Sequence, residues 1–120
     1  MYYKQEIGKF GESKVEEYLI ENNYIIIYKN FKCTFGEIDI IAKDKEKNEL
    51  VFFEVKTRKN VKYGNPIDAV NKIKQKHIYK TSQYFIHKYK LENEFIRIDV
   101  IEVYLKNDDK YFLNHIKQIF

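Results

Sequence analysis

Apolar residues recur with two different periodicities along the first half of the chain, and these periodicities predict one helix and three strands. Between residues 5 and 22 the apolar positions fall on one arc when successive residues are turned by about 100°, as in a helix. Residues 24–32, 37–42 and 50–57 are rich in β-branched and aromatic side chains, which favours strands. The polar segment 43–49 has the length of a hairpin connection between the second and third strands.

The second half predicts another helix and another strand. Asn65 and Pro66 suit the cap and the first turn of a helix that extends to about Tyr89. Residues 95–105 alternate as a strand does, and residues 111–120 are apolar enough to dock on the domain. The apolar stripe of the helix is predicted to contain Val70, Ile73, Thr81, Tyr84 and Phe85. The order helix, three strands, helix, strand predicts an α/β sandwich with a mixed central sheet, as one domain over residues 1–120.

Length and composition narrow the class of protein. A chain of 120 residues with 44% hydrophobic content can bury one core and is too short for two. It contains no apolar run of the roughly 18 residues that span a bilayer, and no apolar stretch at its start, so we expect a cytoplasmic protein without a membrane partner. Cys33 is the only cysteine, which excludes an intramolecular disulfide and a cysteine-rich zinc site.

Positive charge is concentrated in one segment of the chain. The net charge is +4, but residues 56–90 hold ten Lys or Arg against the single acid Asp68, so that segment carries +9 and the remainder −5. Such clustering is typical of a polyanion partner such as nucleic acid, and a solvated lysine-rich helix explains it equally well. The candidate contacts to nucleic acid are Arg58, Lys59, Lys62, Lys72, Lys74, Lys76 and Lys80.

Acidic side chains interrupt two of the predicted strands, in the segments GEIDII (36–41) and VFFEVK (51–56). A buried carboxylate is costly unless it is paired, hydrogen-bonded or bound to a metal, so such a conflict often marks a functional site. If the two strands form a hairpin, Asp39 approaches Glu54 across the ladder, and a hard divalent cation such as Mg²⁺ takes such oxygen ligands. Lys56 shares the face of Glu54. The alternative is that Glu54 and Lys56 form an ordinary ion pair on a solvated face.

Several motifs in combination resemble the YraN family of small bacterial proteins. They are GKFGE (8–12), NF (30–31) before GEID (36–39), VFFEVKTR (51–58), YG (63–64) and RIDV (97–100), and with the tail 115–120 they cover nearly the whole chain. That family is similar to archaeal Holliday-junction resolvases and belongs to the PD-(D/E)XK nuclease superfamily. The resemblance therefore implies a restriction-endonuclease-like sandwich. One departure is Ile38, where the superfamily motif has Pro.

Carried over by position, the resemblance implies a site with four principal residues. Asp39 and Glu54 would be the main metal-binding carboxylates, Glu12 the helix-borne acid that completes the site, and Lys56 the catalytic lysine. The implied cofactor is Mg²⁺ or Mn²⁺, and the implied activity is an endonuclease-type phosphodiesterase that acts on DNA, with branched, Holliday-junction-like DNA among the substrates. By analogy with the symmetric dimers of junction resolvases, a homodimer is also an open expectation.

Two other functions stay open on the sequence alone. A nucleic-acid-binding protein with a nuclease-like fold but no catalysis would use the acids for structure, and it would bind without cleaving in any divalent metal. A scaffold that recognises an acidic protein is a weaker hypothesis. Salt-sensitive binding to nucleic acid would argue against that scaffold.

Overall fold

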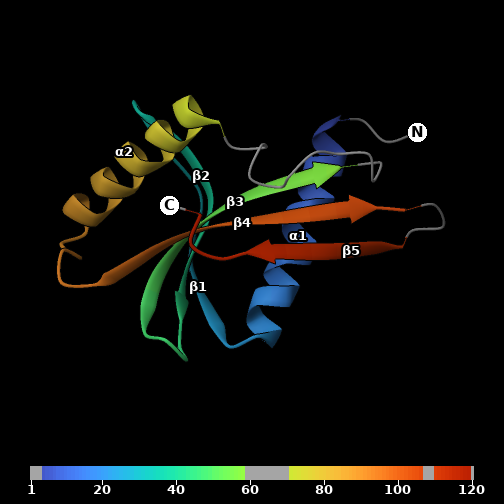
Figure 1. The fold of residues 1–120 in the computed structure, drawn as a ribbon, viewed down its shortest axis with the longest axis horizontal. Coiled ribbons are helices and arrows are strands. Elements are labelled where there is room, and N and C mark those ends of the chain that lie inside the picture. Colours follow the sequence, from blue (N-terminus) through green and yellow to red (C-terminus); the bar gives the residue numbers. More distant parts are fainter. Residues whose placement is uncertain (1–3, 59–70, 107–109, 120) are drawn as a thin grey trace.

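The described part of the chain forms a five-stranded mixed sheet with one helix on each face (Figure 1). The structure is a computed structural model, and it describes residues 4–58, 71–106 and 110–119. Its elements are α1 (Lys4–Glu21), β1 (Tyr24–Cys33), β2 (Gly36–Asp44), β3 (Glu49–Arg58), α2 (Lys72–Lys88), β4 (Phe95–Leu105) and β5 (Tyr111–Ile116). The strands lie side by side in chain order. The predicted α/β architecture with a mixed sheet is confirmed.

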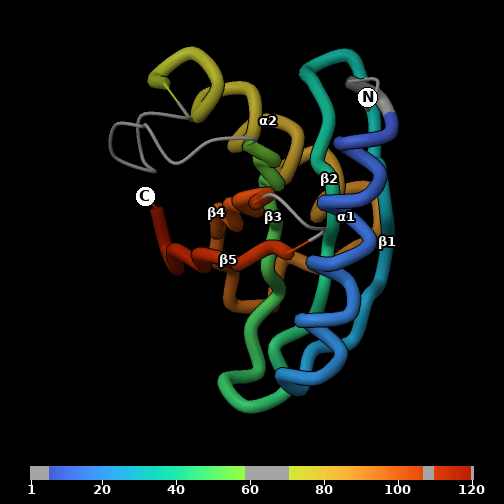
Figure 2. The backbone as a smooth tube through the Cα atoms, turned by 90° about the vertical axis from the view of Figure 1, so that its right-hand side faces the viewer, coloured from blue at the N-terminus to red at the C-terminus, as the bar shows by residue number. Residues whose placement is uncertain are grey.

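The one parallel pair among these strands is β3 and β4, and the other three pairs are antiparallel. Parallel neighbours require the chain to cross one face of the sheet, and α2 lies in this crossover. Helix α1 covers the opposite face, and Figure 1 shows it passing behind β3, β4 and β5. Figure 2 shows the two helices on different sides of the strands in the perpendicular view.

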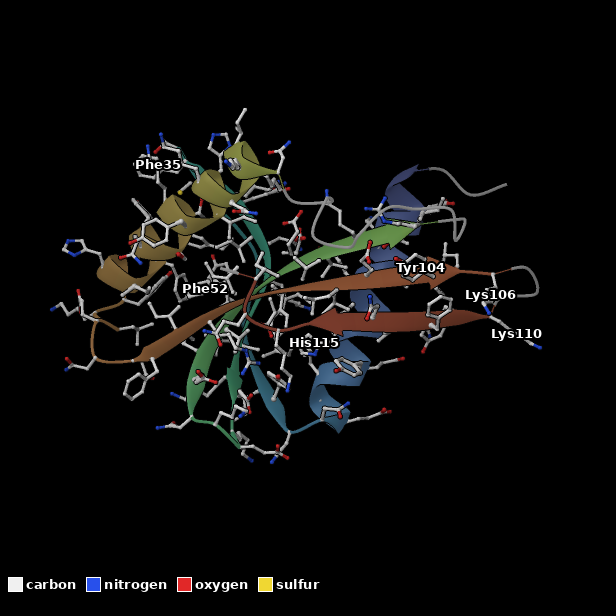
Figure 3. The ribbon with its side chains drawn as sticks, in the orientation of Figure 1. Phe35, Phe52, Tyr104, Lys106, Lys110 and His115 are labelled. Atoms are coloured by element: carbon white, nitrogen blue, oxygen red, sulfur yellow. The ribbon has the colours of Figure 1, made fainter. Side chains whose placement is uncertain are left out.

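Two apolar cores lie on the two faces of the sheet, so the expectation that the chain is too short for two cores was wrong: the sheet divides the buried interior into two layers. The α2-side core consists of Phe31, Ile38, Ile41, Leu50, Phe52, Ile78, Phe85, Ile86, Ile98, Val100 and Ile119. The α1-side core consists of Val15, Leu19, Tyr24, Ile40, Ala42, Val51, Phe53, Ile101 and Val103. Figure 3 shows Phe52 inside the sandwich near α2. Because β3 is covered on both faces, its sequence is a nearly continuous apolar run, and this makes the acid at position 54 conspicuous.

The prediction for α2 was wrong in one respect. The buried residues of the helix are Ile78, Thr81, Ser82, Phe85 and Ile86, whereas Ile73 is 70% exposed and Tyr84 is 43% exposed. The buried set follows the i, i+3, i+4, i+7, i+8 spacing of a single helical stripe, and the predicted set mixed two stripes. The start predicted at Asn65, and Val70, lie outside the described residues, but the extended backbone of Asn71 shows that the helix begins only at Lys72, so the prediction of a helix continuous through this position was wrong. Neither α1 nor α2 is long and apolar enough to span a membrane.

The capped start of α2 is a feature that the sequence reading missed. Asn71 has an extended backbone, and its side-chain oxygen accepts a hydrogen bond from the Lys74 amide at 2.8 Å. An Asn at this position satisfies one of the free N–H groups of the first turn. The cap therefore fixes where the first-turn side chains of α2 lie relative to the sheet.

The C-terminal segment does more than dock, because residues Tyr111–Ile116 form the edge strand β5. This strand pairs antiparallel with β4 from Leu105↔Tyr111 to Val100↔Ile116. Beyond it, the Ile119 amide donates to the carbonyl of Ile98 at 2.9 Å, and the Ile119 side chain joins the α2-side core. The tail thus completes the sheet and closes one end of the core.

Candidate functional site

The strands β2 and β3 separate at the point where the two predicted acids meet. Their ladder runs from Asp44↔Glu49 to Ile40↔Phe53 and ends there. One further step in this register would place Asp39 opposite Glu54. Instead, β3 continues along β4, and the Asp39 Oδ2 atom accepts a hydrogen bond from the Val55 amide at 2.8 Å. Asp39 therefore takes the place of a ladder partner at the fork between two strands.

A local irregularity turns Asp39 toward this fork. Ile38 belongs to the α2-side core and Ile40 to the α1-side core, so the usual alternation of faces is interrupted between them. On the neighbouring strand, Asn30 has a φ of 52°, in the left-handed region that Asn tolerates better than most residues. Together these features free Asp39 from both cores and allow it to reach the β3 backbone.

An open cleft of about 750 Å³ lies at the fork. Its walls come from α1, β1, β2 and β3, and its lining residues are Ile7, Gly8, Glu12, Asn30, Lys32, Glu37, Asp39, Val55, Lys56 and Thr57. Three of the four residues predicted to be catalytic, Glu12, Asp39 and Lys56, thus line one cleft. Helix α1 approaches β3 closely because Gly11 lies against the Thr57 side chain, where a Cβ atom would clash. Gly11 therefore sets the depth at which its neighbour Glu12 enters the cleft.

The carboxylates around the cleft raise one another's pKa. Burial, then the charge of Glu54, raises the pKa of Asp39 from 3.8 to about 7, although the Val55 amide works in the opposite direction. Burial also raises the pKa of Glu12 above its ordinary value of 4.5, and the charges of Glu16, Glu37 and Glu54 add to this effect. The site therefore holds an excess of negative charge, which favours either a proton or a cation.

Glu54 is the most buried of the predicted site residues, at 5% exposure, and two lysines hold it. The Lys74 Nζ atom lies 3.3 Å from Glu54 Oε1, and the Lys56 Nζ atom lies 3.5 Å from the same oxygen. Lys56 comes from the same strand, while Lys74 comes from the first turn of α2. The expected pairing of Glu54 with Lys56 is present, but in a buried setting that includes a second cation.

The remaining predicted contacts to nucleic acid are distributed as follows. The Arg58 Nε atom donates to Glu102 Oε2 at 2.8 Å, so this guanidinium is partly engaged within the protein. Lys72, Lys76 and Lys80 lie on the exposed part of α2, and Lys80 lies 5.8 Å from the centre of the Phe35 ring, which Figure 3 shows beside that helix. Lys59 and Lys62 lie outside the described residues. Over Lys72–Lys88, α2 carries five lysines and no acid.

The donor atoms available to a metal in this cleft are carboxylate oxygens. In residues 4–58, 71–106 and 110–119, no three Asp, Glu, His or Cys side chains converge closely enough to hold an ion without rearrangement. The chemistry of the set nevertheless fits a hard divalent cation, because oxygen ligands and excess negative charge are what Mg²⁺ and Mn²⁺ prefer. Asp39 and Glu54 lie next to each other at the fork, because Asp39 accepts from the Val55 amide and the charge of Glu54 raises the pKa of Asp39.

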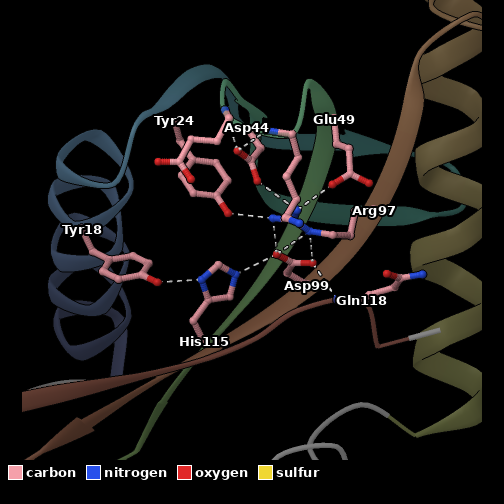
Figure 4. A network of polar contacts seen from close by, with 10 residues as sticks. Tyr18, Tyr24, Asp44, Glu49, Arg97, Asp99, His115 and Gln118 are labelled. Atoms are coloured by element: carbon pink, nitrogen blue, oxygen red, sulfur yellow. Dashed lines mark hydrogen bonds and ion pairs between the residues drawn. The ribbon is translucent and has the colours of Figure 1, made fainter.

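A second cluster of ionisable groups lies on the α1 side of the sheet, and its charges are paired (Figure 4). Arg97 donates to Asp99 at 2.9 Å, to Asp44 at 3.0 Å, to Glu49 at 2.9 Å and to the Tyr24 hydroxyl at 2.7 Å. Burial raises the pKa of Asp99, but hydrogen bonds from His115 and Arg97 outweigh that effect and hold this pKa below 3.8. The arrangement is that of a structural clamp.

His115 belongs to this clamp, and its partners could not be read from the sequence. Its Nε2 atom lies 2.7 Å from Asp99 Oδ2, and its Nδ1 atom lies 2.7 Å from the Tyr18 hydroxyl. These contacts join β5 to β4 and α1. The only signal in the sequence was a polar residue inside an apolar tail.

Fold and cleft together define a small α/β protein with a carboxylate-rich site where two strands of a mixed sheet separate. Comparison with known sequences gives the family. The sequence model of the family described as "Uncharacterised protein family UPF0102" matches residues 11–103, and the chain belongs to this family, which is the YraN family. The resemblance noted from the motifs is therefore confirmed.

Relatives within the family align with nearly the whole chain. A UPF0102 protein of Clostridium botulinum (strain 657 / Type Ba4) is 48% identical over 121 residues, which cover 99% of this chain and 97% of that protein. One of Clostridium tetani is 47% identical, with 98% and 96% covered. One of Caldicellulosiruptor saccharolyticus is 42% identical, with 98% of both proteins covered.

Proposed function

We propose that the protein is a metal-dependent phosphodiesterase that cleaves DNA at the cleft between β2 and β3. The observation that carries this proposal is that Asp39 lies at the strand fork, bonded to the amide of the residue after Glu54, although the charges of Asp39 and Glu54 repel. A fold selected only for stability gains nothing from this repulsion. The order of the acids and Lys56 along the chain also agrees with the PD-(D/E)XK pattern that the sequence resembles.

Asp39 and Glu54 would hold Mg²⁺ or Mn²⁺, with Glu12 as the third carboxylate. When bound, such a cation supplies Lewis-acid polarisation of the phosphate and lowers the pKa of water. Glu12 comes from α1, a separate element from the two strands, and its side chain lines the same cleft as Asp39.

Lys56 would act on the phosphate itself. Its ammonium group lines the cleft beside Glu54, where it would stabilise the negative charge that develops on the phosphate oxygens during attack by water. The attacking water loses its proton to solvent as it bonds to phosphorus. The bond from phosphorus to the leaving oxygen then breaks, and that oxygen takes up a proton from solvent.

The nucleic acid would be bound by the basic face of α2. Five lysines without an acid give this helix a strong attraction for phosphates, and Lys74 connects the helix directly to the cleft. A nucleic-acid strand bound along α2 would therefore reach Lys56. The basic segment predicted from the sequence and the acidic cleft become two parts of one site in this proposal.

The test uses the purified protein and its Glu54→Gln variant, which keeps the shape of the side chain and removes its charge. Both are incubated with labelled branched, duplex and single-stranded DNA in Mg²⁺, Mn²⁺ or EDTA. We expect metal-dependent cleavage by the wild type, a loss of at least 100-fold in the variant, and similar DNA binding by both. If neither protein cleaves any of these substrates in either metal, the proposal fails.

One observation favours a second candidate, a nucleic-acid-binding protein without catalysis. In the described part of the chain the acids do not converge into a ready metal site, and the Glu54 carboxylate forms ion pairs with two lysines. This candidate predicts equal DNA binding with Mn²⁺ or EDTA and no cleavage. Titration of the protein with Mn²⁺ separates the two candidates before any substrate is chosen, because only the nuclease requires saturable binding at Asp39 and Glu54.

A further inference from the structure

Lys74 differs from the other lysines of α2 because it reaches into the sheet. Its ammonium group lies 3.3 Å from Glu54 Oε1, the same oxygen that Lys56 approaches at 3.5 Å. The Glu54 side chain is only 6% exposed, while the side chains of Lys74 and Lys56 are 38% and 36% exposed. One buried oxygen thus has two cations in contact with it, and both cations also reach solvent.

The position of Lys74 is set by the helix rather than by the sheet. The Asn71 side chain accepts a hydrogen bond from the Lys74 amide at 2.8 Å, and this bond fixes the backbone of the first turn. From there the four-carbon side chain extends to Glu54, and a lysine stem can swing its charge by several ångströms without moving the backbone. The backbone of Lys74 is therefore fixed, while its ammonium group can point either inward to Glu54 or outward along the basic helix.

We propose that Lys74 competes with the divalent cation for Glu54, and that its displaced ammonium group then binds a phosphate of the nucleic acid. Metal and nucleic acid would consequently bind cooperatively through this one side chain. The inference rests on the proposed function, because it assigns Glu54 to the cation. It adds a switch that makes the basic helix fully available only when the carboxylate site is loaded.

The competition follows from the charges around Glu54. A divalent cation and two ammonium groups cannot share one carboxylate oxygen without strong mutual repulsion. Lys56 lies two residues from Glu54 on the same strand and lines the cleft, so it remains near the reacting phosphate when it is displaced. Lys74 belongs to a helix with four other lysines and no acid, where the nearest new partner is a phosphate on that helix.

The experiment measures binding alone and compares four proteins. Mn²⁺ affinity is determined by titration with detection of the free ion, for the wild type, Lys74→Ala, Lys74→Arg and Lys76→Ala. Lys76→Ala is the matched control, since it removes the same charge from an exposed position two residues along the same helix. DNA affinity is measured with and without Mn²⁺ by fluorescence anisotropy, on labelled DNA with phosphorothioate linkages that resist hydrolysis. Circular dichroism verifies that each variant is folded.

We expect Lys74→Ala to bind Mn²⁺ roughly two- to fivefold more tightly than the wild type, because a partly exposed ion pair no longer competes for Glu54. The factor by which Mn²⁺ increases DNA affinity should fall to a similar extent, since coupling between two ligands is reciprocal. Lys74→Arg should behave as the wild type does. Lys76→Ala should weaken DNA binding and leave both the Mn²⁺ affinity and the coupling unchanged.

Equal or weaker Mn²⁺ binding by Lys74→Ala would overturn the competition, because a lysine that merely supports the site would weaken the site when removed. That result leaves the proposed function intact as long as the wild type binds Mn²⁺ and Glu54→Gln does not. If the wild type binds no Mn²⁺, both the proposed function and this inference are overturned. The two failures are thus distinguishable in one set of titrations.

Discussion

Replacing Asp39 by Asn should stabilise the metal-free protein at pH 8 and have little effect near pH 4. In the native protein the pKa of Asp39 is raised from 3.8 to about 7, mainly by burial and by the charge of Glu54. The folded state therefore binds its proton more tightly than the unfolded state does. The contribution of Asp39 to stability is therefore most favourable below about pH 4, declines as the pH rises toward 7, and stays unfavourable above that. Asn keeps the oxygen that accepts from Val55 and carries no charge.

The displaced pKa sets the size of this effect. A change from 3.8 to about 7 corresponds to roughly 4 kcal/mol against the charged form at alkaline pH. Because neighbouring acids share part of this energy, we expect removal of the Asp39 charge in Asp39→Asn to gain on the order of 2–4 kcal/mol at pH 8. For a domain of this size such a gain raises the melting temperature by roughly 10 °C.

Urea unfolding followed by circular dichroism in EDTA, at pH 4.5 and pH 8, measures the effect. Glu37→Gln is the matched control, because Glu37 lines the same cleft but its side chain is 51% exposed. Its stability relative to the wild type should change little between the two pH values. A gain for Asp39→Asn that is equal at both pH values, or absent at pH 8, would refute the reasoning. Adding Mg²⁺ at pH 8 should stabilise the wild type and not the variant.

Three further outcomes are expected. Gly11→Ala should lower the free energy of unfolding, measured by thermal melts, by about 2 kcal/mol, because the added methyl group clashes with β3. Gly8→Ala is the control: it has open space around it and should be neutral or slightly stabilising. Arg97→Met should cost about 3–5 kcal/mol in urea unfolding, because it leaves buried carboxylates unpaired, against less than about 1 kcal/mol for Lys29→Met at an exposed pair. DNA binding should weaken steeply with salt, and Lys76→Ala should lower the slope of log K against log salt by about 0.9; an unchanged slope would mean that this lysine contacts no phosphate.

The strands that were predicted from the sequence were those with a long apolar signal. Strands predicted at residues 24–32, 37–42, 50–57 and 95–105 agree with the observed ones to within two residues at each end. Strand β5 was not predicted, because it is short, lies at the edge and is only half-buried, so its pattern is weak. Pairing with β4 supplies what its own sequence does not.

Only those parts of the candidate site that involve residues close together in the sequence could be predicted. The hairpin was predicted from the length of its connection, and the ladder confirms it. The ladder ends one pair before Asp39 and Glu54, so the two acids do not face each other across it as predicted. The contact of Lys74 with Glu54 depends on the crossover and on a cap at Asn71, neither of which an amino-acid pattern locates in space. The break of alternation around Asp39 depends on Asn30 in the neighbouring strand, and sequence spacing alone predicted strict alternation.

The Arg97 clamp holds β2 and β3 together at one end of their hairpin. Arg97 binds Asp44 at the last residue of β2 and Glu49 at the first residue of β3, so it ties the hairpin together at the end remote from the cleft. From Asp44 and Glu49 the two strands run paired as far as Ile40 and Phe53, where their ladder ends. Beyond this point β2 remains paired with β1 and β3 with β4, so Asp39 and Glu54 belong to two different halves of the sheet. The candidate site therefore lies where no ladder joins the two halves, and the Arg97 clamp stabilises the end where they are joined.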